Sequence, residues 1–154
     1  MNNCLKVAKV VIVTNAKKGW VEYSSSIFMP RLHTIVMKFV KIMSARVDFE
    51  EAYPYDTFKW KELAFLKLWD ESGFLDKAAI TNLVALGDAG YEMEAAKNFA
   101  SKSDRCLVKL VKLRECPSFE ELRKEIQVVN DRFNYIFSSF KNLTIKLERY
   151  HSSL

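Results

Sequence analysis

The chain has 154 residues, of which 49% are hydrophobic and 28% charged, and its four glycines and three prolines argue against long disordered or linker segments. No apolar run approaches the roughly 18 residues that cross a bilayer, so we expect no membrane partner. The net charge of +5 is spread along the chain without a dense basic block, so it gives no strong indication of nucleic-acid binding. The three cysteines lack metal-binding spacing and no secretory signal is recognisable, which predicts reduced thiols and a cytoplasmic location.

Strands and helices are predicted to alternate along the first three quarters of the chain. Helices are expected after the serine cluster Ser24–Ser26, with Pro30 in the first turn, then from Asp56 or Thr57, and over residues 91–102. The alternation predicts an α/β fold: a three-layer Rossmann-like domain in which helices flank one short parallel sheet of about four strands. Apolar runs predict these strands at residues 7–14, 38–44, 81–90 (ending on Gly87-Asp88) and 105–113.

The segment 118–150 has the most regular pattern. Ser118 followed by Glu121 is a capping box, so we predict a long C-terminal amphipathic helix, or a helix pair that breaks near Ser138-Ser139, packing on a core of residues 1–117. Such a helix could instead bind a partner or a second copy of the chain. Its apolar residues recur every three or four positions, at Phe119, Leu122, Ile126, Val129, Phe133, Ile136, Phe140, Leu143 and Leu147.

Polar residues stand where three of the predicted strands end. Thr14, Ser44 and Asp88 follow apolar runs, and ligands of parallel α/β sheets bind beyond the carboxyl ends of the strands. Each residue alone is typical of an ordinary turn. Together they predict a site for a phosphorylated small molecule at one edge of the sheet.

The combination resembles the haloacid dehalogenase-like superfamily. It consists of a strand that ends in Thr14-Asn15, a later helix that carries Lys59 and Lys61, and a strand that ends in "GDAGYE". More narrowly, this chain is similar to a little-characterised branch of that superfamily from eukaryotic microbes in the segments "TNAKKGWVEYSSSIFMPRL", "SARVDFE", "FKWKELAF" and "ALGDAGYEMEAA". The resemblance covers roughly residues 8–130, and "TNA…GWVE" and "GD…YE" are its most specific parts.

The resemblance implies a role for each of these residues. Thr14, with Asn15, would bind the transferring phosphoryl group, and Lys61, or else Lys59, would stabilise negative charge there. Asp88 and Glu92 would hold Mg²⁺, a cation that prefers oxygen ligands from one or two carboxylates, water and phosphate. A glutamate at the start of a helix is also favoured by the helix dipole alone, so Glu92 has a purely structural explanation as well.

The family's nucleophile is missing from this sequence. It is an aspartate on a central strand that precedes the second motif, whereas the first acidic residue here is Glu22 and the first aspartate is Asp48. The resemblance therefore implies a domain that lacks its first-motif strand and cannot form the covalent phosphoryl intermediate. Three alternatives stay open: the strands ending at Thr14 and Asp88 pair directly, another chain supplies the strand, or the sequence is part of a longer, active Mg²⁺-dependent phosphohydrolase.

Overall fold

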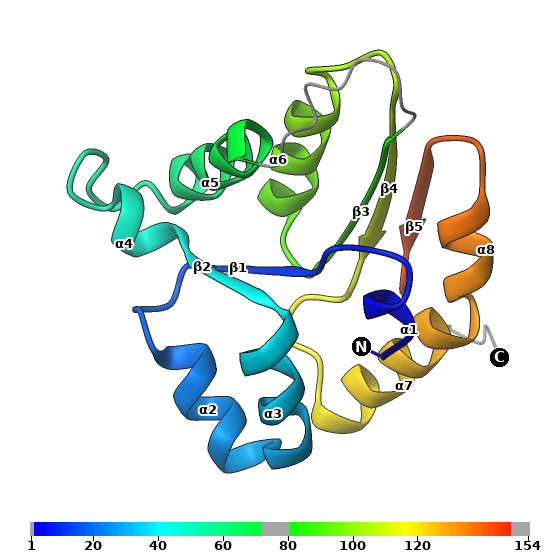
Figure 1. The fold of residues 1–154 in the computed structure, drawn as a ribbon, viewed down its shortest axis with the longest axis horizontal. Helices are drawn as coiled ribbons and strands as arrows, with labels where there is room; N and C mark the ends of the chain where they lie inside the picture. Colours follow the sequence, from blue (N-terminus) through cyan, green and yellow to red (C-terminus); the bar gives the residue numbers. More distant parts are fainter. Residues whose placement is uncertain (1, 72–80, 149–154) are drawn as a thin grey trace, which may run out of the picture. The chain divides into compact units, whose positions relative to one another are not determined.

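The computed structural model describes residues 2–71 and 81–148 (Figure 1). The chain has an α/β fold with two small parallel sheets, one of two strands and one of three. It divides into two units, residues 1–64 and residues 65–154, and the division falls within helix α5 (Thr57–Glu71). None of the described helices is long and apolar enough to cross a bilayer.

Unit 1 is built on one βαβ crossover. Strands β1 and β2 pair in parallel, and helices α2 and α3 form the connection between them. Pro30 is the first residue of α3, as predicted, because a proline there removes no helical hydrogen bond. The elements are α1 (Asn2–Leu5), β1 (Val11–Thr14), α2 (Trp20–Phe28), α3 (Pro30–Phe39), β2 (Lys41–Ser44), α4 (Ala45–Phe49) and the first half of α5.

The serine cluster does not cap a helix, which corrects the sequence prediction. Helix α2 already begins at Trp20, so Ser24, Ser25 and Ser26 lie inside it. Their hydroxyls donate to carbonyls three or four residues earlier, as Ser24 does to Trp20 at 2.7 Å. These local hydrogen bonds use the serine hydroxyls inside the helix, so the three serines do not act as N-caps.

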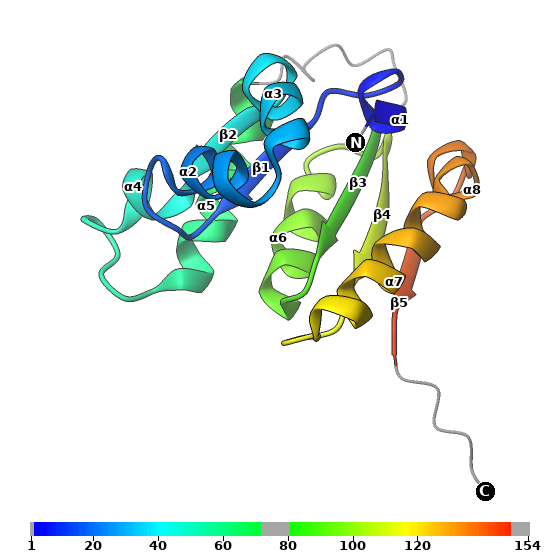
Figure 2. The same cartoon turned by 90° about the horizontal axis from the view of Figure 1, so that it is seen from below.

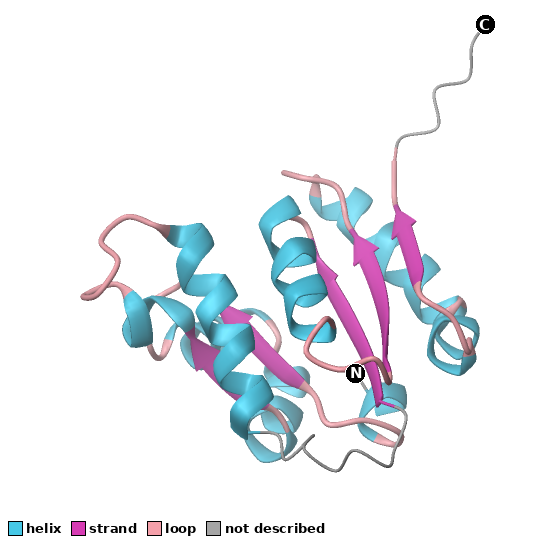
Figure 3. Cartoon of the chain, turned by 90° about the horizontal axis from the view of Figure 1, so that it is seen from above, coloured by secondary structure: helices cyan, strands magenta, loops and turns pink. Residues whose placement is uncertain are grey.

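Unit 2 contains the larger sheet, with strand order β3-β4-β5 and parallel pairing throughout. Figure 2 shows α6 on one face of this sheet and α7 and α8 on the other, and Figure 3 shows that the arrows within each sheet point the same way. The elements are β3 (Thr81–Gly87), α6 (Gly90–Ala100), β4 (Cys106–Lys112), α7 (Phe119–Asp131), α8 (Phe133–Ser138) and β5 (Leu143–Lys146).

The core of unit 2 lies between the sheet and α6. Met93 and Ala96 of α6 pack against Ala85 and Leu110 of the two longest strands. At the other end of α6, the Phe99 ring packs edge-on against Trp69, with ring centroids 5.0 Å apart. Small alanines on the inner side of α6 let the helix approach the sheet closely, which fixes where its N-terminus lies relative to the end of β3.

The structure does not show the long C-terminal helix. Helix α7 ends at Asp131, α8 has only six residues, and residues 143–146 form strand β5, while residues 149 and 150 lie outside the described part of the chain. The capping box at Ser118 and Glu121 is present, with both hydrogen bonds formed. In "LTIKL" apolar and polar residues alternate, so the segment also has the period of a half-buried strand.

The predicted single sheet is likewise replaced by two. All four predicted strands are present, and parallel pairing is confirmed, but β5 was not predicted. Among the described residues β1 pairs with β2 in unit 1, and β3 pairs with β4 in unit 2.

Candidate functional site

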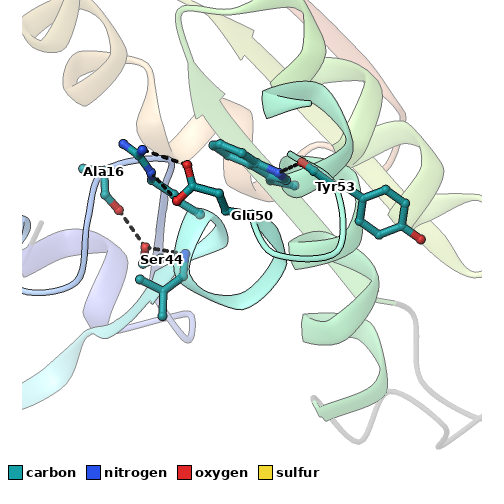
Figure 4. Close-up of polar contacts among 7 residues, drawn as sticks. Ala16, Ser44, Glu50 and Tyr53 are labelled. Atoms are coloured by element: carbon teal, nitrogen blue, oxygen red, sulfur yellow. Dashed lines mark hydrogen bonds and ion pairs between the residues drawn. The ribbon is translucent and has the colours of Figure 1, made fainter. Parts of the chain in front are cut away.

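Thr14 and Ser44 are the last residues of β1 and β2 and are partners in the register of the sheet. Thr14 Oγ1 accepts a hydrogen bond from the Ala16 amide at 3.0 Å, which turns the chain sharply after the strand. Ser44 Oγ donates to the Ala16 carbonyl at 2.6 Å and accepts from the Val47 amide at 3.2 Å, so it also caps α4 (Figure 4). Both hydroxyls therefore bond to the backbone of Ala16, one to its amide and one to its carbonyl, and stabilise the same turn.

Lys61 brings a buried cation to this strand end. Its side chain comes from α5, is only 3% exposed, and donates from Nζ to the Val13 carbonyl at 2.9 Å. Lys59 does not reach β1: its Nζ lies 2.7 Å from Glu62 Oε2, and that hydrogen bond raises the pKa of Lys59 above its usual value. Of the two lysines that the sequence left open, the structure brings Lys61 to Thr14's strand.

Asn15 is anchored beside them by a bond to α5. Its Nδ2 donates to the Thr57 carbonyl at 3.2 Å. Its Oδ1 is buried and has no hydrogen-bond partner among the described residues. An amide oxygen is an acceptor, so this atom suits a ligand that carries a donor, such as the hydroxyl of hydrogen phosphate. We call Thr14, Asn15, Ser44 and Lys61 the β1–β2 site.

Sequence reasoning did not identify the ionic pair that follows β2. Arg46 donates from Nε and Nη2 to the Glu50 carboxylate at 2.8 and 2.7 Å, and its guanidinium lies 5.9 Å from the centre of the Trp60 ring. The Arg46 hydrogen bond lowers the pKa of Glu50. Trp60 in turn donates to the Tyr53 carbonyl at 2.7 Å (Figure 4). The four-residue spacing of Arg46 and Glu50 is a signal from which this pair could have been predicted.

The second group of predicted residues lies in unit 2, at the carboxyl end of β3. Asp88 directly follows the strand and is exposed, and Glu92 lies in the first turn of α6. Glu92 Oε2 accepts from the Ala89 amide at 3.4 Å and occupies the space where a Cβ on Gly87 would project. A Cβ at residue 87 would meet this carboxylate, which is the end of a flexible side chain and would have to move aside. The helix start, the strand end and the glycine together place both acidic residues at one end of β3.

Lys112, at the end of β4, is a further residue of this group that the sequence did not single out. Its Nζ donates to the backbone carbonyl of Asp88 at 2.6 Å and to Glu115 Oε1 at 3.0 Å. Burial raises the pKa of the Tyr91 hydroxyl, and the negative charges of Glu92, Asp88 and Glu115 raise it further. We call Asp88, Glu92 and Lys112 the β3–β4 site.

The β3–β4 site contains two carboxylate residues, Asp88 and Glu92. No group of three or more His, Cys, Asp or Glu side chains that could hold a metal occurs in the described part of the chain. Two carboxylates fit Mg²⁺, which keeps several waters and takes its remaining ligands from phosphate, better than they fit a structural zinc site, which needs four protein ligands.

Comparison with known proteins gave no match: no family model, no curated protein and no solved structure corresponds to this chain. The functional interpretation therefore depends on the residues themselves. Each of the two units carries its own set of polar residues at the carboxyl end of a parallel strand.

Proposed function

We propose that this chain is a haloacid dehalogenase-like domain that binds phosphate at the β1–β2 site and that the sequence as given does not by itself catalyse phosphoryl transfer. The observation that supports this proposal most strongly is the buried ammonium of Lys61, which lies 2.9 Å from the Val13 carbonyl at the end of β1. A buried cation at a strand end attracts an anion, because charge that is removed from water interacts more strongly with an opposite charge.

The two hydroxyls of the β1–β2 site have different parts in this proposal. The Ser44 hydroxyl donates its hydrogen bond to the Ala16 carbonyl, so its part is to position the turn. Thr14 accepts from the Ala16 amide, and its own proton is engaged by none of the contacts found among the described residues, so it is the donor to a phosphate oxygen. Thr14 and Lys61 then supply the hydrogen bond and the charge that hold the anion.

We further propose that Asp88 and Glu92 bind Mg²⁺ weakly. The two residues would supply two carboxylate ligands near the start of α6, and water molecules would complete the octahedral coordination of the ion. In the same interpretation β1 and β3 correspond to the second-motif and fourth-motif strands of a Rossmann-like core that lacks the first-motif strand. A cytoplasmic protein with reduced cysteines fits this proposal, since the three cysteines are free thiols.

The phosphate site is tested by equilibrium binding of inorganic phosphate, followed by phosphorus NMR. Replacing Lys61 by methionine keeps the length of the side chain and removes its charge, so we expect affinity to fall about 10- to 100-fold, the range for a lost hydrogen bond to a charged group. Lys59→Met is the matched control, because its ammonium pairs with Glu62, and it should bind as the wild type does. Thr14→Val should also weaken binding.

Equal phosphate affinity in the wild type, Lys61→Met and Thr14→Val would contradict the proposed site. Far-UV circular dichroism of each variant separates a lost fold from a lost ligand contact.

Catalytic incompetence is tested with an aryl phosphate and Mg²⁺. We expect no hydrolysis above the uncatalysed rate, because no carboxylate precedes Glu22 and a covalent intermediate needs one on the strand beside the phosphate. Steady turnover that disappears in Asp88→Asn would show an active hydrolase and overturn this part of the proposal.

A further inference from the structure

Helix α2 of unit 1 carries an apolar stripe that faces solvent. Trp20, Tyr23 and Ile27 follow one another at helical spacing, so they lie on one side of the helix. Their exposed fractions are 55%, 61% and 51%, and the centroids of the Trp20 and Tyr23 rings are 6.4 Å apart. Surface helices of globular proteins normally turn such a stripe toward the core.

The turn between α2 and α3 extends this apolar surface. Met29 ends α2 and precedes the first residue of α3 (Figure 1). Phe28 is 75% exposed and Met29 49%, so with Ile27 and Pro30 the turn presents four consecutive apolar side chains to solvent. Such a run is unusual on a protein surface unless it serves a contact. We call the following residues the α2–α3 apolar patch: Trp20, Tyr23, Ile27, Phe28 and Met29.

The packing between α2 and α3 does not use this patch. Ser25 is only 3% exposed, and its hydroxyl lies 2.9 Å from Nδ1 of His33 on α3. Val36 of α3 is also buried. Two polar side chains thus meet between the helices while apolar side chains face outward, the reverse of the usual arrangement. An exposed apolar residue of the patch can therefore be replaced without disturbing the contact between the helices.

The charges around the patch are positive. Residues 1–45 contain seven basic side chains and one acidic side chain. The acidic residue, Glu22, is half-buried, and the Oε2 atom of its carboxylate is buried. Lys18 and Arg31 are exposed, one just before α2 and one just after the turn that ends it. The surface therefore combines projecting apolar side chains with basic side chains at both ends of α2.

We propose that the α2–α3 apolar patch docks on the surface of a bilayer that contains anionic lipids. Charge complementarity selects this occupant, because a second copy of the chain would bring like charges together. Helices with aromatic and aliphatic residues on one face and basic residues beside them lie in the bilayer interface, where Trp and Tyr rings sit at the level of the headgroups. The lack of a long apolar run bears on crossing a bilayer and not on docking to its surface.

The test is co-sedimentation of the full chain with phosphatidylcholine vesicles, either pure or with about one third phosphatidylserine. We expect binding to the anionic vesicles and much weaker binding to the neutral ones. Because Trp20 is exposed, its entry into the interface should shift the fluorescence emission to shorter wavelength. Trp20→Phe should still bind, without that part of the shift.

Two variants test the apolar and the basic part separately. Phe28→Gln should weaken binding about 10-fold, because a phenyl ring no longer leaves water. Arg31→Gln should weaken it about 5-fold, the effect of one basic residue near an anionic surface. Phe140 and Lys141 are exposed residues of unit 2, so Phe140→Gln and Lys141→Gln are the matched controls and should bind as the wild type does. Circular dichroism checks that each variant is folded.

The proposal is overturned if the full chain does not sediment with the anionic vesicles, if it binds the neutral vesicles equally well, or if Phe28→Gln binds as tightly as the wild type does. A dimer in analytical ultracentrifugation that Phe28→Gln dissociates would assign the patch to a second copy and would also overturn it. Excess inorganic phosphate at constant ionic strength should not release the chain from the vesicles. Release would mean that the β1–β2 site, and not the patch, holds the lipid.

Discussion

At the scale of single residues, the sites differ in how their polar atoms are already used. Thr14 and Ser44 are both hydroxyl residues at strand ends, but Ser44 donates to a backbone carbonyl and Thr14 only accepts. Both residues carry a hydroxyl at a strand end, but Ser44 already donates its proton and Thr14 does not, so only Thr14 can donate to a ligand. The two lysines of α5 also differ in position: Lys61 donates to the Val13 carbonyl of β1, and Lys59 pairs with Glu62.

The contact between Gly87 and Glu92 yields a prediction at this scale. A Cβ at Gly87 would collide with the Glu92 carboxylate, so Gly87→Ala must move that carboxylate away from the end of β3. We expect Mg²⁺ affinity, measured by calorimetry, to fall about 10- to 100-fold, as it does when a group that orients a metal ligand is lost. The melting temperature should change little, because the end of a flexible side chain can swing aside.

Gly90→Ala is the control for that experiment. No atom lies within 4 Å of a Cβ built at Gly90, which is the first residue of α6. It should therefore bind Mg²⁺ as the wild type does. If Gly87→Ala also retained full affinity, Glu92 would not be a ligand.

At the scale of elements, strand β4 is buried and contains a buried lysine, Lys109. Leu110 and Val111 are 2% and 1% exposed, as expected for a strand covered on both faces. Lys109 lies between Val108 and Leu110 and is completely buried, and its Nζ donates to Asn82 Oδ1. Burial lowers the pKa of the Lys109 ammonium. The folded chain therefore releases this proton at a lower pH than the unfolded chain.

This difference predicts how stability depends on pH. Below the depressed pKa the buried charge destabilises the fold, and stability rises as the pH increases from that value toward the unfolded value of 10.5. Lys109→Met lacks the charge, so at neutral pH it should equal or exceed the wild type, by up to about 1–4 kcal/mol. Its advantage should shrink between neutral pH and pH 10.5. Urea unfolding at several pH values, followed by circular dichroism, measures the difference.

The exposed Lys97 of α6 supplies the control, since its ammonium pairs with Glu94 at the surface. The stability difference between Lys97→Met and the wild type should stay small across the same pH range. A strong loss of stability in Lys109→Met at neutral pH would mean that the bond to Asn82 outweighs the cost of burying the charge.

Elements with one dominant pattern could be predicted from the sequence, and β5 could not. The four predicted strands are short, mainly apolar runs that end on polar or turn residues, and this pattern favours a strand. Leu143 and Leu147 are four residues apart, a spacing that suits a helix. With Ile145 between them, apolar and polar residues also alternate along residues 143–147, a pattern that suits a strand. Pairing with β4 decides between the two, and Val108 adds a bond from its amide to Asn142 Oδ1 at 2.9 Å.

At the scale of the whole molecule, the sequence predicted the parallel strands but not how they divide into sheets. Pairing joins residues far apart in the chain, and a local apolar run does not specify its partner. The position of Lys61 was also beyond local reasoning. Lys59 and Lys61 lie about 200° apart around a helix, so only one can face β1, and the packing of α5 decides which.

Amide chemical shifts during a phosphate titration report whether an anion binds where β1 and β2 end. Inorganic phosphate should shift the backbone amide resonances of residues 14–16 and 44–47 in a saturable manner, because the Ala16 and Val47 amides donate to the Thr14 and Ser44 hydroxyls. The same titration of Lys61→Met should leave those resonances where they are. Saturable shifts elsewhere, or none at all, would contradict the account.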